Sequence, residues 1–527
     1  MLHDFYHIQG EWGNFHHGFV EILGGGVPGR WPRDMSTMSR SSLLGGHGRR
    51  EAAGRLSSSR RRVTVSSLNV STSSVEATNS DIKEAETLVG SIGVALDNLP
   101  VKPARVQSGI GLISKRELWR GEEILAVPRK SWITVATVKE SPIGSAVEGQ
   151  RPWVCLALFL LWERSNLNSP WKSYFKLLPA ELNSTLFWSD EELAELQGTQ
   201  LLGSTLSFKE FVETEFERVR SEVLVPNMAL FDPSVFNLEA FSWAFGILRS
   251  RTFPPLTGED LALVPLADFI NHGAAASDAR PSWELRKGTG FFGSQDALVV
   301  RAQGDFRAGQ EVVMDYGAEK GNGQLALEYG FVESAESTAA FLQSQSRDCF
   351  TLTLEIPEGD RFADDKVDIA DINGFGASVS FDLVCGQGPS EDMLTYLRLM
   401  VLDGPDAFLL EALFRDAAWG HISLPVSREN EEGICTAMLD GCRAALEGYG
   451  TSVDEDVRLL AAGIDDPRLK VAVVVRLGEK RVLQELQGWF EAHLARLDKL
   501  EYYAERRLRD LGLLDDKGFM TPWVFNE

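Results

Sequence analysis

The spacing of apolar residues changes twice in the first half of the chain. Over residues 81–99 it predicts a short linker helix, because apolar side chains recur at helical intervals until two prolines intervene. Over residues 106–128, short apolar runs alternate with glycine and charged turns, which is typical of strands. We expect a β-meander here, with a hairpin connection at residues 120–122.

Between about residues 138 and 250 the apolar residues return to helical intervals, and many of them are aromatic. This pattern predicts a helical insert between two sets of strands. Two further strand-like runs follow at residues 298–300 and 312–314, with Gly309 in the turn between them. The second run leads directly into Tyr316.

The last part of the chain, beyond about residue 347, begins with one strand-like run at residues 350–356. After that run the pattern is almost entirely helical. The longest helical pattern extends over residues 469–511, and Gly512 follows as a helix-ending residue. No stretch of the chain reaches the roughly 18 uninterrupted apolar residues that a membrane span requires. We therefore expect no membrane-spanning segment.

The 527 residues, 44% of them hydrophobic and 24% charged, are enough for two or three folded domains. Five cysteines without CxxC spacing argue against a disulfide framework or a structural zinc, so we expect no metal. The net charge of the chain is −24. Residues 1–80 contain nine Arg, no Lys and six acidic residues, a net charge of +3, so residues 81–527 carry −27. An acidic body repels phosphates, which predicts a protein partner and no nucleic acid.

The segment of residues 35–80 is rich in Ser and Arg and contains only two acidic residues, Glu51 and Glu76. This composition is typical of an organelle transit peptide, so residues 1–80 are predicted to be a transit segment. A disordered tail without a targeting role is the alternative. Residues 1–34 lack a basic start, which leaves Met35 or Met38 as alternative translation starts.

The most specific pattern lies in the middle of the chain. Asp268, Asn271 and His272 follow an apolar run, and a later strand-like run ends at Tyr316. An Asn-His pair alone is typical of a turn, and a Tyr-Gly pair of a strand end. In this order, and with a GxG string upstream at residues 109–111, they resemble the active centre of a SET-domain protein methyltransferase.

The resemblance extends over most of the chain. Residues 100–335 resemble a SET domain with the helical insert, and residues 345–527 resemble the helical substrate-binding domain of plant Rubisco methyltransferases, whose C-terminal helices the strings at 477–480 and 502–507 match. The resemblance implies an α+β fold, in which a SET-domain β-fold with a pseudoknot precedes an all-helical C-terminal domain. It also implies transfer of a methyl group from S-adenosylmethionine to a protein lysine, without a metal.

The resemblance also implies a set of cofactor contacts. The residues at the matching positions are Ser108, Gly109, Ile110, Gly111, Arg251, Asn271, His272, Tyr316 and Phe331. Glycine permits close approach of the backbone, and the planar fork of Arg251 suits a carboxylate. Many relatives have an acid where this chain has Ser108, which leaves an ionic contact to the cofactor's ammonium open.

For the substrate, the matching residues are Arg251, Phe253, Asp268, Trp283, Tyr316 and Tyr329. Tyr316 is the expected catalytic residue, because in-line methyl transfer needs an aligned, neutral amine rather than a strong base. The charge of Asp268 suits a cationic substrate on the peptide side of the lysine channel, and the apolar Phe253 favours lysine over histidine. Trp283 stands where Rubisco methyltransferases have a tyrosine, and its aromatic face attracts cations.

The sequence therefore predicts a monomeric protein-lysine methyltransferase of the plastid. The family suggests Rubisco large subunit or a plastid aldolase as its substrate. Two alternatives stay open: methylation of lysine or histidine in a cytosolic or nuclear protein, and a SET-fold binding module without catalysis.

Overall fold

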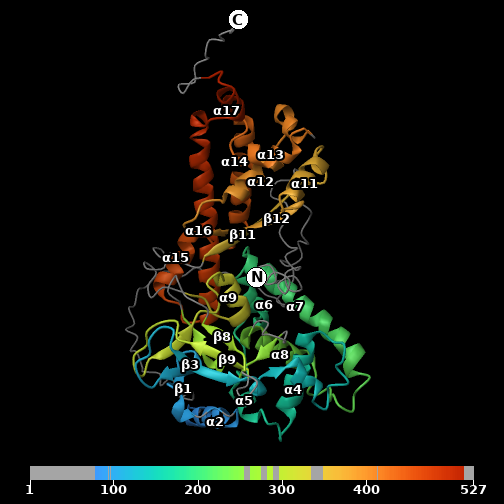
Figure 1. The fold of residues 1–527 in the computed structure, drawn as a ribbon, viewed down its shortest axis with the longest axis vertical. Coiled ribbons are helices and arrows are strands. Elements are labelled where there is room, and N and C mark those ends of the chain that lie inside the picture. Colours follow the sequence, from blue (N-terminus) through green and yellow to red (C-terminus); the bar gives the residue numbers. More distant parts are fainter. Residues whose placement is uncertain are drawn as a thin grey trace, which may run out of the picture. The chain divides into compact units, whose positions relative to one another are not determined.

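The computed structural model describes residues 78–92, 94, 96–253, 261–273, 282–288, 296–333, 348–411 and 413–514. The predicted transit segment lies outside the described residues except for its last three positions. Most buried apolar side chains belong to two cores, one within residues 85–312 and one within residues 350–490. Figure 1 shows the strands of the first region in blue to yellow and the helices of the second in orange and red.

Three small sheets contribute to the first core. One sheet contains, in spatial order, β1 (Val101–Val106), β2 (Gly109–Ser114), β10 (Glu311–Met314) and β7 (Asn271–His272). A second contains β3 (Glu123–Pro128), β9 (Ala297–Arg301) and β8 (Trp283–Arg286). The third contains β4 (Ile133–Thr134), β6 (Ala262–Leu263) and β5 (Thr252–Phe253). The pairs in these sheets are antiparallel, apart from the parallel pair of β10 with β7.

The predicted β-meander is wrong in its pairing. β2 forms a hairpin with β1 and also pairs with β10, whereas β3 pairs with β9 in another sheet. The turn at residues 120–122 therefore connects two sheets. The two strands predicted before Tyr316 are confirmed as β9 and β10, and Gly309 has the φ of +81° expected for a turn glycine. Apolar runs indicate where strands lie, but not which strands become partners.

The first region also contains a helical insert, as predicted. Its helices are α3 (Val135–Lys139), α4 (Pro152–Ser165), α5 (Lys172–Leu177), α6 (Asp190–Ala194), α7 (Gln200–Val219) and α8 (Leu238–Arg251). α4 is buried on nearly every side, and Trp153 at its start packs against Phe241 and Phe245 of α8 with ring centroids 5.7 and 5.4 Å apart. This packing fixes α8, whose last residue is Arg251.

Helix α2 (Thr78–Ser91) is part of the folded body rather than a linker. Its residues Ala85, Leu88 and Val89 are at most 1% exposed and belong to the same core as the strands. The apolar spacing predicted the helix correctly, but it gave no information about what the helix packs against.

Helix α9 (Asn322–Tyr329) ends at Gly330, which has a φ of +80°. A Cβ at this position would lie 2.3 Å from the backbone of Asn183, so only glycine fits. The helix end places Tyr329 and Phe331 on either side of this turn.

The described part of the C-terminal region is helical apart from one hairpin. Its helices are α11 (Ala363–Ile372), α12 (Glu391–Met400), α13 (Arg415–Ile422), α14 (Arg428–Glu447), α15 (Val453–Ala462), α16 (Pro467–Leu494) and α17 (Tyr503–Asp510). The predicted strand is confirmed as β11 (Cys349–Glu355), but its partner β12 (Ser378–Val384) corrects the all-helical expectation. Polar and apolar residues alternate along β12, as expected of a partly buried strand, so the sequence did carry a signal for it.

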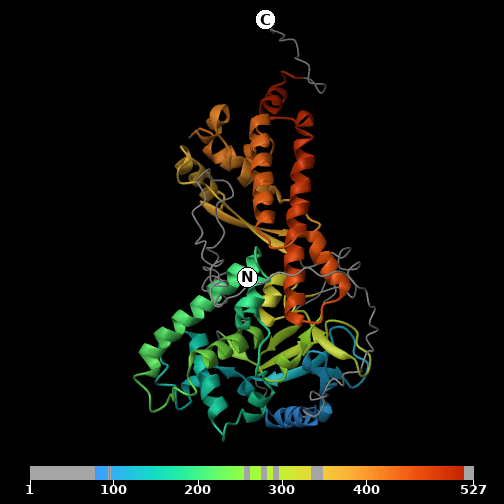
Figure 2. The same cartoon turned by 180° about the vertical axis from the view of Figure 1, so that it is seen from behind.

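The long helix expected at residues 469–511 is also corrected. It is divided into α16 and α17, because the chain turns at residues 495–502 and the backbone N–H of Tyr503 donates to the carbonyl of Val426. Figure 2 shows α16 from behind, extending along α14. Among the described helices, none is both long and apolar enough to cross a membrane.

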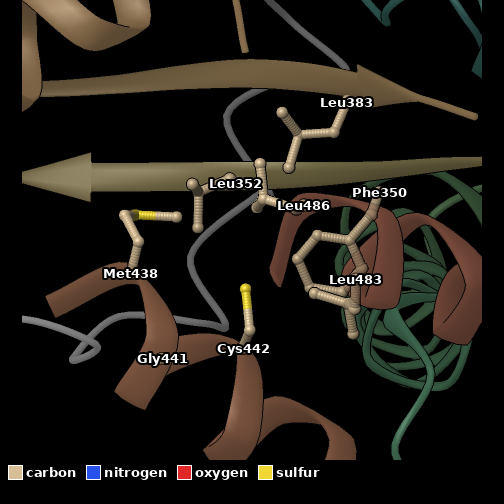
Figure 3. Close-up of a pocket in the computed structure, with 8 residues that line it drawn as sticks. All are labelled: Phe350, Leu352, Leu383, Met438, Gly441, Cys442, Leu483 and Leu486. Atoms are coloured by element: carbon tan, nitrogen blue, oxygen red, sulfur yellow. The ribbon is translucent and has the colours of Figure 1, made fainter. Parts of the chain in front are cut away.

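The hairpin of β11 and β12 packs on α14 and α16 through apolar side chains. Figure 3 shows the small pocket left between them, lined by Phe350, Leu352, Leu383, Met438, Gly441, Cys442, Leu483 and Leu486. The lining offers no charged group, so we interpret this space as an imperfection of core packing.

Candidate functional site

The Asn-His pair lies on β7, beside the end of β10. Asn271 is opposite Val313 in the parallel pair, and Gly273 follows so closely that a Cβ there would lie 2.4 Å from the Val313 side chain. Just upstream, Leu266 is fully buried with a φ of +77°. A leucine in this conformation is strained, and strain of this kind tends to occur at functional sites.

His272 connects this loop to Tyr316. Its Nδ1 accepts a hydrogen bond from the backbone N–H of Tyr316 at 3.2 Å, and its Nε2 lies 2.6 Å from Glu333 Oε1. Because Nδ1 is the acceptor, the proton of a neutral imidazole lies on Nε2 and is donated to Glu333. The histidine therefore holds the backbone of the predicted catalytic residue in place.

Tyr316 is enclosed by aromatic rings. Its ring centroid lies 4.6 Å from that of Tyr329, 5.2 Å from that of His272 and 6.3 Å from that of Phe331. The hydroxyl donates to the carbonyl of Ile270 at 3.0 Å. Burial raises the pKa of Tyr316 to about 12 and raises the pKa of Tyr329 as well. The phenol thus stays protonated, and its oxygen lone pairs are free to accept a hydrogen bond from an amine.

Partly exposed Arg251 and buried Asp268 form an ion pair. Arg251 Nη1 donates to Asp268 Oδ2 at 3.2 Å and to its backbone carbonyl at 3.1 Å, and the hydroxyl of Tyr174 donates to the same Oδ2 at 2.8 Å. Burial raises the pKa of Asp268, while Arg251 and the tyrosine hydroxyl oppose the rise. The Asp268 side chain is only 1% exposed, and its place beside a substrate channel stays a prediction.

The predicted glycine-rich turn lies at the β1–β2 hairpin. Ser108 is exposed in the turn, and Gly109 has a φ of +109° with open space where a Cβ would point. Gly111 also permits a close approach within the protein, because a Cβ there would lie 2.8 Å from Asn271 Nδ2, and its cofactor contact stays a prediction. That amide donates to the carbonyl of Ile110 at 3.3 Å. Gly111 thus lets the Asn-His loop approach β2.

Phe253 and Trp283 form a T-shaped pair with ring centroids 5.9 Å apart. Phe253 is buried, whereas Trp283 is partly exposed on β8. Among the described residues, no ring contact joins this pair to Tyr316. The structure thus brings His272, Tyr316, Tyr329 and Phe331 together, but leaves the two other aromatics as a separate pair.

Three residues of the site were missed in the sequence. Tyr174 donates to Asp268, Glu333 accepts from His272, and Glu311 Oε1 accepts from Asn271 Nδ2 at 2.8 Å. Glu333 is two positions after Phe331, and Glu311 begins the strand that leads to Tyr316, so proximity along the chain was a usable signal. No such signal marks Tyr174, which is one of many aromatics in the insert.

The residues present fit a cofactor with an amino-acid carboxylate. Arg251 uses only Nη1 within the described part of the chain, so Nε and Nη2 are free to bind a carboxylate. The open Cβ direction of Gly109 offers room for a ligand beside the backbone. Glu311 and Ile110 already occupy the Asn271 amide nitrogen, which leaves the side-chain Oδ1 of Asn271 for a ligand.

Comparison with known proteins identifies relatives along most of the chain. The family described as Rubisco LSMT substrate-binding matches residues 357–483. The chain is 46% identical over 431 residues to the chloroplastic Rubisco large-subunit N-methyltransferase of Nicotiana tabacum, covering 82% of this chain and 86% of that one. It is also 46% identical to the chloroplastic fructose-bisphosphate aldolase-lysine N-methyltransferase of Arabidopsis thaliana, covering 82% and 87%.

A solved structure gives the same result. The SET domain of LSMT bound to lysine and AdoHcy matches with a TM-score of 0.74 and 43% identity, over 83% of this chain and 97% of that one. The predicted SET fold, cofactor and enzyme class are thereby confirmed, and the chloroplastic relatives confirm the plastid location. The chain belongs to the Rubisco large-subunit methyltransferase-like family of SET-domain protein-lysine N-methyltransferases, which use S-adenosylmethionine as methyl donor.

Proposed function

We propose that Tyr316 is the catalytic residue and that the substrate is a lysine of a plastid protein. The observation that carries this proposal is the double anchoring of Tyr316. Its backbone N–H bonds to His272 and its hydroxyl to the carbonyl of Ile270, so the phenol oxygen is fixed between aromatic rings. A fixed acceptor of this kind orients an amine for in-line attack.

The side chains around Tyr316 favour a neutral amine. A lysine entering beside these rings loses water, and desolvation lowers the pKa of an ammonium, so its proton is released to solvent before reaction. Tyr316 accepts a hydrogen bond from the neutral amine and aims its lone pair. S-adenosylmethionine supplies a methyl carbon on a sulfonium, so the N–C bond forms as the C–S bond breaks and a neutral thioether leaves. No strong base is required from the protein.

We assign the cofactor-binding role to residues from both sides of this centre. They are Ser108, Gly109, Ile110, Gly111, Arg251, Asn271, His272, Tyr316 and Phe331. The free guanidinium nitrogens of Arg251 support a carboxylate contact, and the open space at Gly109 supports backbone contact. Gly111 also permits the close approach to Asn271.

For the substrate, we assign Tyr316 and Tyr329 to the lysine side chain and Phe253 with Trp283 to an apolar wall beside it. The apolar character of Phe253 favours lysine over histidine. Rubisco large subunit and fructose-bisphosphate aldolase are the two candidate substrates, because they are the proteins that the two similar enzymes are named for. We assign residues 345–527 to substrate binding and expect a monomer that does not bind nucleic acid.

The test is methylation of purified candidate substrates. The full chain is incubated with methyl-labelled S-adenosylmethionine and either Rubisco or aldolase, and the label is located by mass spectrometry. We expect label on one lysine of one substrate with the unchanged chain and little or none with Tyr316→Phe. Label on histidine, or equal label with the variant, would refute the proposed assignment.

A matched control is Tyr396→Phe. Tyr396 is fully buried in the C-terminal core, and its hydroxyl donates to the carbonyls of Gly376 and Ala377. This variant loses a similar hydrogen bond away from the site, so we expect methylation at nearly the unchanged rate.

A further inference from the structure

The side chains around Asp268 come from three separate elements. Tyr174 is on α5 of the helical insert, Arg251 ends α8, and Asp268 lies in the short 3-10 turn Ala267–Phe269 before β7. Tyr174 is 0% exposed, and the Asp268 side chain is 1% exposed. A buried carboxylate needs charge and hydrogen-bond partners, and these two residues supply them to one of its oxygens.

The hydrogen bonds of this cluster are incomplete on two sides. Asp268 Oδ1 has no hydrogen-bond partner in the described structure, although it is buried. Arg251 donates from Nη1 to Asp268 Oδ2 and to the backbone carbonyl of Asp268. Because the guanidinium is planar, two bonds at one nitrogen fix the directions of the remaining donors on Nε and Nη2.

We propose that Tyr174 and Asp268 are positioning residues that hold Arg251 so that its free edge binds the carboxylate of the cofactor's methionine portion. This inference rests on the proposed cofactor role of Arg251. It extends the cofactor site to the helical insert, because Tyr174 lies 94 positions before Asp268 in the chain.

Tyr174 is well suited to this role. Its ring is stacked on Phe269 with a centroid distance of 6.4 Å and an angle of 21°, so the hydroxyl has a fixed position. Burial raises the pKa of Tyr174 well above its usual value, which keeps the hydroxyl a donor. Without that donor, Arg251 alone would hold the Asp268 carboxylate, and the plane of Arg251 would be less firmly fixed.

The test compares two ligands that differ only in the carboxylate. S-adenosylhomocysteine and its decarboxylated analogue are titrated by calorimetry into the full chain and into Tyr174→Phe. We expect the variant to bind S-adenosylhomocysteine about fivefold more weakly, because one hydrogen bond to a charged group is lost. Its affinity for the decarboxylated analogue should stay within about twofold.

A second variant keeps the test decisive if Tyr174→Phe folds poorly. Asp268→Asn keeps the shape of the side chain and removes its charge, and we expect about a tenfold loss that is again confined to the ligand with a carboxylate. Tyr396→Phe serves as the matched control and should bind both ligands like the unchanged chain.

Three results would contradict the inference. Equal weakening of both ligands by Tyr174→Phe would indicate a merely structural role, and unchanged affinity for S-adenosylhomocysteine would remove Tyr174 from the cofactor site. If the unchanged chain bound neither ligand, the proposed cofactor site itself would be wrong, and the inference with it.

Discussion

The cluster around Asp268 and the cluster around Asp456 are both buried and charged, but their hydrogen bonds are completed differently. Asp456, on α15, is 0% exposed and accepts from Arg476 Nε at 2.8 Å, Thr451 Oγ1 at 3.1 Å and Lys480 Nζ at 2.5 Å. Lys480 Nζ also donates to the Thr451 carbonyl. In contrast, Asp268 keeps one oxygen without a partner in the described structure.

We interpret this difference as that between a cluster that stabilises the fold and one that can bind a ligand. The Asp456 cluster ties α15 and α16 together, and Arg476 Nη1 extends it to Glu195 at the end of α6 with bonds of 2.9 and 2.8 Å. The charged groups of this cluster are paired with one another within the protein. The Asp268 cluster retains two guanidinium nitrogens of Arg251, which is what a ligand-binding site requires.

The largest expected effect comes from breaking the completed cluster. Asp456→Asn removes the charge that Arg476 and Lys480 share, which leaves buried Lys480 without an anion and Arg476 with Glu195 alone. We expect the free energy of unfolding to fall by about 3 to 5 kcal/mol. Denaturant unfolding measures this loss, and Asp440→Asn is the control because its pair with Arg443 is about 60% exposed on both sides. A fall below about 1 kcal/mol, as for a surface pair, would contradict a structural role.

Removing the hydroxyl of Tyr316 should lower activity rather than stability. Tyr316→Phe is expected to lower kcat about a hundredfold, because the amine loses the group that orients it. The melting temperature should shift no more than that of Tyr396→Phe. Initial rates of methyl transfer and thermal unfolding are measured on the same samples. A large loss of stability with little loss of kcat would place Tyr316 among the structural residues.

A further test is the dependence of stability on pH, to which Glu479 contributes. This buried residue of α16 accepts from the backbone N–H of Gln200 at the start of α7 and from the hydroxyl of Tyr449. Burial raises its pKa from 4.5 to about 7, so the folded state binds the proton more tightly than the unfolded state. Its contribution to stability is therefore complete below pH 4.5 and is lost as the pH rises to about 7, by about 3 kcal/mol.

The variant Glu479→Gln should remove this dependence on pH. Unfolding measured from pH 4.5 to pH 8 is expected to show a smaller decline for the variant than for the unchanged chain. Glu485→Gln, an exposed residue on the same helix, is the control and should keep the decline. An identical decline in Glu479→Gln would mean that other groups cause it.

The smallest expected effect is at Glu333, the hydrogen-bond partner of His272. Glu333→Ala removes the acceptor of the Nε2 proton, so the imidazole that holds the Tyr316 backbone is less well oriented. We expect kcat to fall about fivefold, equivalent to one hydrogen bond, with KM for the protein substrate nearly unchanged. Steady-state kinetics decide this, and a change in KM alone would assign Glu333 to substrate binding.

The order of motifs predicted which residues of the candidate site lie together. Asn271, His272 and Tyr316 carry their signal in residue type and order, and the structure places His272 directly against Tyr316. Helical spacing also located the insert, because a buried helix face leaves a periodic trace in the sequence.

Pairing and orientation could not be predicted in the same way. A strand's apolar run is the same whether its partner is near or distant, so β3 was assigned to the wrong sheet. The residue type of Asp268 suggested a charged contact, but only the fold shows that its carboxylate points into the protein. Tyr174 shares its burial with many aromatics, and its distinguishing hydrogen bond crosses 94 positions.

The most direct test measures the affinity for S-adenosylhomocysteine and the melting temperature of Arg251→Lys and Asp456→Asn, at a temperature where both variants are folded. The account predicts that Arg251→Lys binds the ligand about tenfold more weakly with little change in melting temperature, because the fork is lost while the charge is kept. Asp456→Asn should melt at a clearly lower temperature and bind with unchanged affinity. Equal loss of affinity in both variants would contradict the division between an incomplete functional cluster and a complete structural one.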